Sequence, residues 1–447
     1  MSTAGTHAQW SSRVGFVLAA TGSAVGLGNI WKFPYMVGQS GGAAFVLVYL
    51  ACILAIGLPI LVAEWMLGRR GQRNPVNTML LLSRANRRSS AWAVVGAGGV
   101  LAAFLILSFY SVIGGWALAY VGEAAAGHFA GLVGDGSQAA FDTLLGSTGT
   151  LLGWHTAFML LTVGIVALGV TRGIEAAARL LMPALAVLLL VLIAHGASTD
   201  GFAPTVSYLF RPDWGRLDID VVLAAMGHAF FTLSLGMGIM MAYGSYLGRD
   251  VDLLSTARSV IALDTLFAIG AGFVIFPIVF SHGLAADSGP GLLFITLPVG
   301  FGAMNGGALI GTAFFVLLSF AALTSAISLI EPVVEFVEER SPLGRVAATW
   351  AVGLATWLLG IAALLSFNLW QDLRLAGLNV FDLLDHVTGT FLLPLTGFGA
   401  VLFAGWCLDR ESVRAELGLT HGAFRAWEIL TRYVTPAGVL VIFLASL

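Results

Sequence analysis

Long apolar segments that carry almost no charged residues recur along the whole chain. Eleven such segments are separated by more polar connections, at residues 14–36, 43–66, 92–121, 156–170, 180–194, 221–246, 260–281, 309–330, 346–367, 391–408 and 433–447. Most of them reach or approach the roughly 20 residues that a helix needs to cross about 30 Å of hydrocarbon. The pattern predicts an all-α integral membrane protein with about eleven transmembrane helices.

The composition excludes an ordinary soluble protein. Of the 447 residues, 58% are hydrophobic and only 10% are charged, whereas a soluble domain carries about 25% charged residues. Cys52 and Cys407 both lie in apolar segments, which argues against a disulfide framework or a thiolate metal site. The formal net charge of −3 gives no reason to expect nucleic acid as a partner. We expect a lipid bilayer as the surroundings and no obligatory protein partner.

The arginines are distributed unevenly between the two sets of connections. The connection after the second segment carries Arg69, Arg70, Arg73, Arg84, Arg87 and Arg88. The connection at 122–155, on the opposite side, contains neither lysine nor arginine. Because positively charged loops remain in the cytoplasm, we expect the N terminus inside and the C terminus outside the plasma (inner) membrane of a bacterium.

Two of the apolar segments are interrupted by glycines near their middle. The first is interrupted at 22–29, which ends in Asn29, and the sixth at 232–238, which begins with Thr232. Glycine weakens a helix interior, and a pair of interrupted spans at corresponding positions of two halves is typical of inverted-repeat transporters. Unwound carbonyls can coordinate a cation, and freed N–H groups can hold an anion. A close-packed glycine seam is the alternative, but the polar side chains beside the breaks favour a binding site.

Two hydroxyl side chains share one helical face of the eighth segment. Ala321, Thr324 and Ser325 are spaced i, i+3, i+4. Their oxygens would suit a hard cation without adding a fixed charge. Hydroxyls in membrane helices also commonly bond back to the preceding turn, and the spacing alone leaves that alternative open.

Several motifs, found in the same order, resemble the neurotransmitter:sodium symporter family and, within it, the bacterial amino-acid transporters. The matching runs are WSSRVGF from Trp10, GSAVGLGNIWKFPY from Gly22, EWMLGR from Glu64, FFTLSLG from Phe230 and LTS from Leu323. The resemblance implies a ten-helix core at residues 13–408, built as a 5+5 inverted repeat with unwound first and sixth helices. Residues 1–12 would form a cytoplasmic segment, and residues 409–447 a cytoplasmic connection and an eleventh helix.

The same resemblance implies that two Na⁺ ions bind at the breaks. The first ion would contact Ala24, Asn29, Thr232 and Asp264. Family members commonly have Asn where this chain has Asp264; a carboxylate at mid-membrane costs about 2.5–3.5 kcal/mol on insertion scales and needs a partner. Na⁺ is one partner, and a proton or water in a cavity wall is the alternative. The second ion would contact Gly22, Val25, Ala321, Thr324 and Ser325.

The resemblance further places a substrate between the two breaks. Members that carry biogenic amines have an Asp where this chain has Gly26, so an uncharged position implies a substrate with its own carboxylate. The residues implied to contact it are Ala24, Leu27, Gly28, Ile106, Tyr110, Phe231, Thr232, Ser234, Met237, Ser325 and Leu329. The side chains implied to surround the substrate side chain are apolar, which favours a hydrophobic amino acid.

The gates are also implied by the resemblance. They are Lys32 and Asp385 on the outer side and Trp10, Tyr246 and Glu339 on the inner side. The outer pair is normally Arg–Asp, and lysine lacks the bidentate geometry of arginine. The usual inner arginine aligns with His7, which leaves the cation partner of Glu339 open.

Taken together, the resemblance implies sodium-coupled symport of large aliphatic or aromatic L-amino acids into the cell by alternating access. Ala268 stands where chloride-dependent members have Ser, which implies transport without chloride. A proton-coupled transporter of the same architecture and an amino-acid sensor that binds without transport remain as alternatives. An enzyme is not expected, because the mid-membrane polar residues form no nucleophile–base pair and no His or Cys metal cluster.

Overall fold

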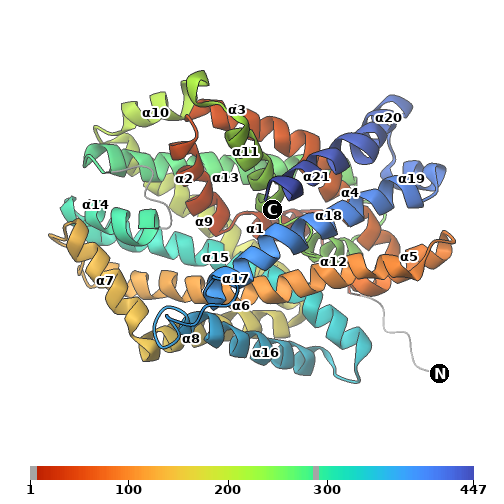
Figure 1. Ribbon diagram of the computed structural model, residues 1–447, viewed down its shortest axis with the longest axis horizontal. Coiled ribbons are helices and arrows are strands. Elements are labelled where there is room, and N and C mark those ends of the chain that lie inside the picture. The colour runs from red at the N-terminus through yellow and green to blue at the C-terminus, as the bar shows by residue number, and fades with distance from the viewer. Residues whose placement is uncertain (1–7, 285–290, 447) are drawn as a thin grey trace.

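The computed structural model describes residues 8–284 and 291–446, and nearly all of them are helical (Figure 1). Those residues contain no β-strand, only isolated bridges at Gly42–Pro212 and Leu375–Leu378. The long helices run across Figure 1, and shorter helices gather at its two ends. One end has α7 (Gly134–Gly146), α10 (Phe202–Phe210) and α14 (Leu297–Ala303), and the other has α5 (Pro75–Ala85) and α19 (Arg410–Leu417).

Nine helices of the described residues are long and apolar enough to cross a membrane, and ten if one bent pair counts as a single span, against about eleven predicted; the sixth predicted span is too interrupted to pass by length. The nine are Ala43–Gly71, Ser90–Ala125, Thr148–Ala167, Val170–Ala197, Leu253–Ser281, Gly307–Arg340, Arg345–Leu365, Val380–Cys407 and His421–Ala445. The first span consists of α1 (Arg13–Ala24) and the helical segment Gly28–Gln39, bent by 53° at their junction. The sixth consists of α11 (Ile219–Thr232) and α12 (Ile239–Ser245) with six irregular residues between them.

Most of the spans contain one principal α-helix, in several cases extended by a π-helical turn. The second span holds α3 (Ala43–Cys52) and α4 (Leu58–Gly71), and the first ends with α2 (Phe33–Gln39). The others hold α6 (Ala93–Ala125), α8 (Thr148–Ala167), α9 (Ala176–Ala197), α13 (Leu253–Ser281), α15 (Gly307–Arg340), α16 (Arg345–Leu365), α17 (Val380–His386) with α18 (Leu393–Leu402), and α20 (His421–Ile429) with α21 (Thr435–Ala445).

The fourth and fifth spans are longer than the apolar pattern indicated. The fourth begins at Thr148 rather than near residue 156, and the fifth begins at Val170 rather than near residue 180. Between them the chain turns at Gly169, whose φ of +87° is a conformation that favours glycine. Polar residues near the helix ends are compatible with helical structure, so hydropathy alone underestimates the length of these spans.

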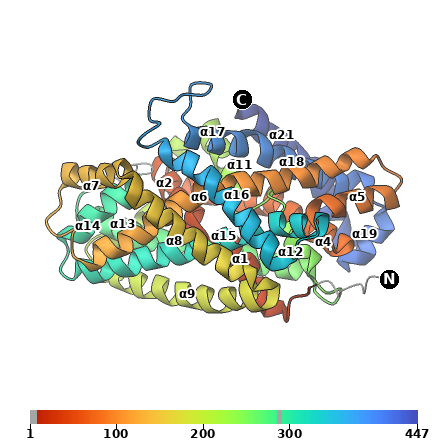
Figure 2. The same cartoon turned by 90° about the horizontal axis from the view of Figure 1, so that it is seen from below.

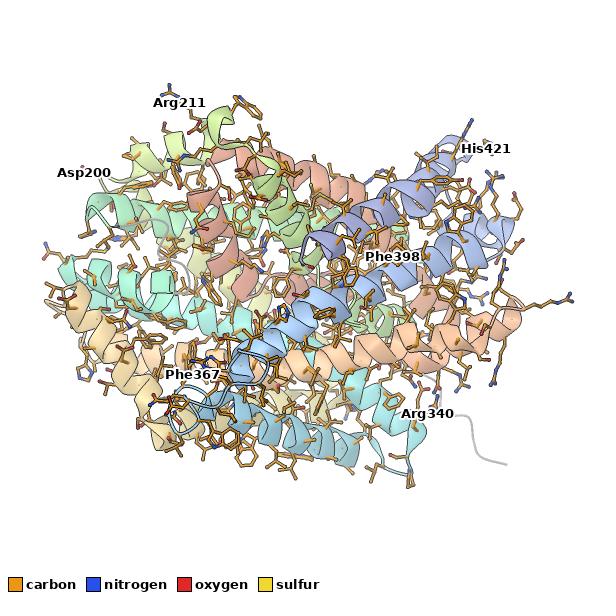
Figure 3. All side chains as sticks on the ribbon, in the orientation of Figure 1. Asp200, Arg211, Arg340, Phe367, Phe398 and His421 are labelled. Carbon is orange, nitrogen blue, oxygen red and sulfur yellow. The ribbon has the colours of Figure 1, made fainter. Side chains whose placement is uncertain are left out.

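The helices of the breaks lie at the centre of the molecule. Helices α6 and α15 pack along each other, and α1 packs against α9, α13 and α15 (Figures 1 and 2). Helix α12 packs against α4. In Figure 3 the labelled polar residues Asp200 and Arg211 lie at one end of the long axis, and Arg340 and His421 lie toward the other. Other polar side chains, among them Asn29, Thr232 and Asp264, are buried.

The break in the sixth span is fixed by contacts with the second and tenth spans. Gly236 has a φ of +74°, and a Cβ there would come within 3 Å of the carbonyl oxygen of Leu393 and the hydroxyl of Thr396. Its N–H donates to Glu64 Oε1 at 2.8 Å, and its carbonyl accepts from the Thr396 hydroxyl at 2.5 Å. These bonds replace the helical ladder, so the unwound backbone has partners in the bundle interior.

Candidate binding site at the helix breaks

A small cavity of about 40 Å³ lies between the breaks of the first and sixth spans. Its walls come from residues at both breaks and from α6 and α15. The lining residues are Ser23, Ala24, Gly26, Leu27, Gly28, Ile106, Tyr110, Phe231, Thr232, Ser234, Met237, Ser325 and Leu329. The structure thus brings together all eleven residues that the sequence resemblance implied for the substrate site, and it adds Ser23 and Gly26.

Polar groups from different spans meet in this cavity. The Ser234 hydroxyl donates to the carbonyl of Ser23 at 2.9 Å, which ties the two breaks together. The backbone N–H of Leu27 donates to the Tyr110 hydroxyl oxygen at 3.4 Å. Carbonyls can accept from an ammonium group, and N–H and hydroxyl groups can donate to a carboxylate. The cavity therefore offers partners for both ends of a zwitterion.

The remaining walls of the cavity are apolar and close together. Ile106, Met237 and Leu329 are each 4% exposed. A Cβ on Gly26 would overlap the Ser325 hydroxyl oxygen and come within 3.2 Å of the Tyr110 hydroxyl oxygen. Glycine is therefore the residue that leaves this part of the cavity open.

A fully buried carboxylate lies beside the cavity. Asp264 Oδ1 accepts from the Asn29 amide at 2.7 Å, and the Thr232 hydroxyl donates to both carboxylate oxygens, at 3.1 and 3.2 Å. Tyr49 adds a hydroxyl at 3.3 Å. No Lys, Arg or His forms an ion pair with Asp264 in the part of the chain that the structure describes. A buried charge needs compensation, and this oxygen-rich group fits a cation.

The Tyr49 contact was not predicted from the sequence. A tyrosine within an apolar span usually indicates packing, and Tyr49 does pack against Phe33 and His228, at ring-centroid distances of 5.2 and 5.4 Å. Its hydroxyl becomes significant only because Asp264, from a span far along the chain, lies within reach. The sequence carries no local signal for this pairing.

A second group of oxygens lies where α1 faces α15. Ser325 Oγ lies 3.5 Å from the carbonyl oxygen of Gly22, and a Cβ on Gly22 would stand 3.2 Å from Thr324 Cβ. Thr324 Oγ1 donates to the carbonyl of Ala321 at 3.0 Å, and Val25 follows in an extended conformation at the end of α1. Gly22, Ala321, Thr324 and Ser325 thus meet where α1 faces α15. A hydroxyl that donates to a carbonyl still has lone pairs for a cation.

The predicted outer gate residues border a larger cavity above the first. This cavity has a volume of about 290 Å³ and is lined in part by Phe231, Tyr110, Lys32 and Asp385. Lys32 Nζ lies 5.0 Å from the centre of the Phe231 ring. Lys32 and Asp385, both among the described residues, form no ion pair here. The outer side is therefore separated from the smaller cavity by aromatic side chains rather than by a salt bridge.

The end of the molecule that the sequence predicts to face the cytoplasm contains contacts from Trp10 and a buried ion pair. The Trp10 N–H donates to the carbonyl of Tyr246 at 3.1 Å, and its indole N–H donates to the carbonyl of Tyr243 at 3.0 Å. The Tyr246 hydroxyl donates to Glu331 at 2.7 Å, and Glu331 pairs with Arg345 through both carboxylate oxygens. The sequence alone shows no link between Glu331 and Arg345, because they belong to different helices, α15 and α16.

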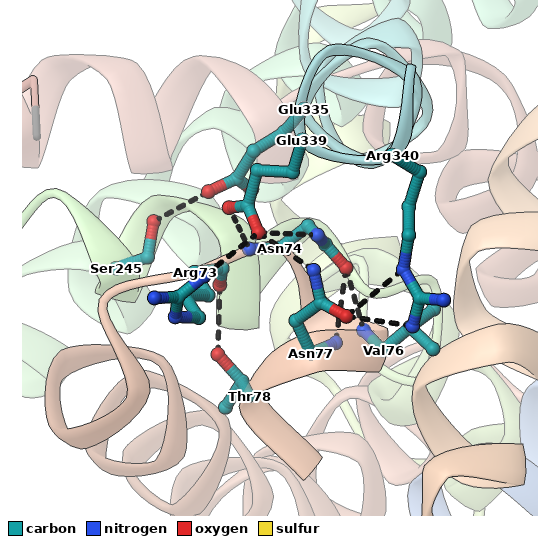
Figure 4. A network of polar contacts seen from close by, with 9 residues as sticks. All are labelled: Arg73, Asn74, Val76, Asn77, Thr78, Ser245, Glu335, Glu339 and Arg340. Atoms are coloured by element: carbon teal, nitrogen blue, oxygen red, sulfur yellow. Dashed lines mark hydrogen bonds and ion pairs between the residues drawn. The ribbon is translucent and has the colours of Figure 1, made fainter. Parts of the chain in front are cut away.

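Glu339 makes different contacts from those expected of an inner gate residue. It accepts from the backbone N–H and the side-chain amide of Asn74, at 2.8 and 2.7 Å, and from the amide of Asn77 at 2.8 Å (Figure 4). Arg73 approaches it to 4.0 Å. Glu339 thereby holds the start of α5 against α15. His7, its aligned partner, lies outside the described residues.

The Glu331–Arg345 pair predicts a large effect on stability. Replacing Arg345 by Ala would leave Glu331, which is fully buried, without its cation. Breaking a buried pair costs about 3–5 kcal/mol, so we expect Arg345→Ala to lower the free energy of unfolding by about that amount, measured by denaturation in detergent. Arg414→Ala is the control, because its pair with Glu411 is exposed and such pairs contribute about 0–1 kcal/mol. Equal stability of the two variants would contradict the prediction.

Comparison with known proteins agrees with this architecture. The chain matches the model of the sodium:neurotransmitter symporter family over residues 7–130 and 140–447. It is 38% identical over 440 residues to YhdH, an uncharacterised sodium-dependent transporter of Bacillus subtilis, with 98% of this chain and 97% of the relative covered. A 31% identical relative is an uncharacterised sodium-dependent transporter of Haemophilus influenzae, with 98% of each chain covered.

A solved structure extends the similarity to three dimensions. The crystal structure of MhsT in complex with L-phenylalanine matches with a TM-score of 0.90 and 43% identity, and the match covers 98% of this chain and 100% of MhsT. The residues that match the family model include both helix breaks. The chain therefore belongs to the sodium:neurotransmitter symporter family, whose members are sodium-coupled membrane transporters and not enzymes.

Proposed function

We propose that this protein carries large aliphatic or aromatic L-amino acids into a bacterial cell together with Na⁺. The observation that carries the proposal is one cavity that combines partners for a zwitterion with apolar walls formed by Ile106, Met237 and Leu329. The glycine at position 26 favours an amino acid over an amine as the substrate. An Asp at this position would repel the substrate carboxylate, and Gly26 carries no charge. MhsT, solved with L-phenylalanine, is a similar protein.

The proposal assigns two Na⁺ ions to the site. One ion would balance the negative charge of Asp264. It would also contact Asn29, Thr232 and the carbonyl of Ala24. The other would bind between α1 and α15, at the hydroxyls of Thr324 and Ser325 with the carbonyls of Gly22, Val25 and Ala321. Because the ions bind at the backbone breaks that also hold the substrate, occupancy of each favours the other, which is the physical basis of coupling.

Alternating access would then require the two sides to open in turn. On the outer side, Lys32 and Asp385 would approach each other and Phe231 and Tyr110 would cover the substrate. On the inner side, the contacts of Trp10 with the sixth span would break. Opening the two sides in turn requires that the packed helices have two distinct arrangements, because packed interfaces do not deform continuously.

Purified protein in liposomes tests the proposal. An inward sodium gradient should drive accumulation of labelled phenylalanine or leucine, and a potassium gradient of the same size should not. Excess unlabelled tryptophan should compete, whereas dopamine should not. Accumulation driven by a proton gradient without sodium would support the proton-coupled alternative, and saturable binding without uptake would support a sensor.

Chloride dependence can be measured in the same liposomes. Because Asp264 can supply the negative charge that chloride provides elsewhere, and Ala268 offers no hydroxyl, we expect uptake to be unchanged when gluconate replaces chloride. A loss of more than about half of the initial rate, with sodium held constant, would show that chloride is needed.

A further inference from the structure

Another buried carboxylate, that of Glu175, lies at the inner end of the first span, away from the cavity. Glu175 is 1% exposed and ends the π-helical turn Val170–Glu175 that begins the fifth span. It accepts from the backbone N–H of Ser11 at 2.9 Å and from the Ser11 hydroxyl at 2.6 Å. Glu175 therefore binds the residue directly after Trp10.

Neighbouring groups fit closely around this carboxylate. Arg179 Nη2 donates to Glu175 Oε1 at 2.7 Å and to the hydroxyls of Ser11 and Ser12 at 2.8 and 2.9 Å. Ser12 also accepts from the N–H of Gly15 and caps α1. A Cβ on Gly15 would overlap the Glu175 carboxylate. The start of α1 is thus shaped to receive this side chain.

Two adjacent residues therefore attach the inner end of the first span to two different spans. Trp10 is bonded to the sixth span through the carbonyls of Tyr243 and Tyr246. Ser11 is bonded to the fifth span through Glu175. If the inner side opens by movement of the first span, both attachments must break together. Bonds to a charged acceptor are the stronger kind, so the Glu175 attachment opposes opening substantially.

We propose that Glu175 is a positioning residue that holds the inner side closed until the ions and the substrate have bound. This inference rests on the proposed alternating-access function. Removing the carboxylate would shift the equilibrium toward the inward-open state. Binding from outside requires the inner side to be closed. The apparent affinities for Na⁺ and substrate would therefore fall in proportion to the fraction of molecules whose inner side is closed.

Cysteine labelling measures the opening directly. Ala19 lies on α1 about two turns after Ser12 and is 3% exposed, so Ala19→Cys serves as the reporter in a Cys52→Ser, Cys407→Ser background. We expect Glu175→Ala to raise the labelling rate by at least about tenfold, because it removes the two charge-assisted bonds from Ser11. Saturating Na⁺ with phenylalanine should lower that rate again, which a general folding defect would not do.

Matched variants test the proposed role of the hydrogen bonds between Glu175 and Ser11, which we call the latch, separately from other effects of substitution. Glu175→Gln should give a smaller increase than Glu175→Ala, because its amide oxygen still accepts from the Ser11 N–H. Glu411→Ala removes an exposed acid from α19, without contact to the first span, and should leave labelling unchanged. If Glu175→Ala does not fold, Ser11→Ala carries the test, with an expected increase of about threefold from loss of one hydroxyl bond.

The outcomes distinguish this inference from the proposed function. Labelling rates equal to the parent in both Glu175→Ala and Ser11→Ala would overturn the latch, even if liposome uptake is driven by sodium. A raised rate that Na⁺ and phenylalanine lower would support the latch. Failure of sodium-driven uptake in the unmutated protein would overturn the proposed function, whatever the labelling rates are.

Discussion

Replacing Asp264 by Asn should lower the affinity for Na⁺ by about a hundredfold or more. The substitution keeps the size of the side chain but removes a fully buried negative charge that has no Lys, Arg or His ion-pair partner among the described residues. Loss of one partner from a buried charge pair costs about 3–5 kcal/mol, and each 1.4 kcal/mol is a factor of about ten. Binding of radioactive sodium to the purified protein measures the change.

The matched control for this prediction is Asp142→Asn. Asp142 is exposed on α7 and accepts a hydrogen bond from Gln138, so the same chemical change there should leave sodium binding unaltered. Substrate binding at a fixed sodium concentration should fall in Asp264→Asn and recover when sodium is raised. Unchanged sodium affinity in Asp264→Asn would show that the carboxylate does not bind the ion. If, in that case, the pH dependence of substrate uptake changed in Asp264→Asn, the carboxylate would bind a proton instead of Na⁺.

The helix breaks could be predicted from the sequence because their signal is local. Glycines and polar side chains within a few residues of each other interrupt an otherwise apolar run at 22–29 and at 232–238. The structure places both breaks beside one cavity, and the residues named from the resemblance line it. A residue type that is unusual for its surroundings, such as Asp264 at mid-span, can likewise be recognised without coordinates.

Pairings between distant segments could not be predicted in this way. Tyr49 contacts Asp264 across more than two hundred residues of chain, and the sequence shows only one of many tyrosines in an apolar span. Glu331 lies within α15 and Arg345 begins α16, and nothing in the local sequence indicates that the two form an ion pair, although Glu331 is fully buried. Glu175 lies between the apolar segments 156–170 and 180–194, so hydropathy does not indicate that it is buried. Such positions depend on how spans pack, which hydropathy does not determine.

Replacing Gly26 by Asp should abolish amino-acid uptake. The Cβ alone would overlap the Ser325 hydroxyl oxygen, and the carboxylate would extend into the cavity next to Tyr110. A substrate that brings a carboxylate would then face a like charge in a site with little water, and like charges there repel strongly. We expect phenylalanine binding to fall by more than about a hundredfold, since repulsion of a few kcal/mol is sufficient.

Gly26→Ala separates the effect of volume from that of charge. It adds only the methyl group, so we expect a loss of about tenfold, as for a modest steric conflict in a packed site. Gly164→Ala in α8 is the control, because a Cβ there meets no atom within 4 Å. If Gly26→Asp bound phenylalanine as well as Gly26→Ala does, the substrate carboxylate would not lie near position 26. The cavity between the breaks would then hold the substrate in another orientation, or the amino acid would bind elsewhere.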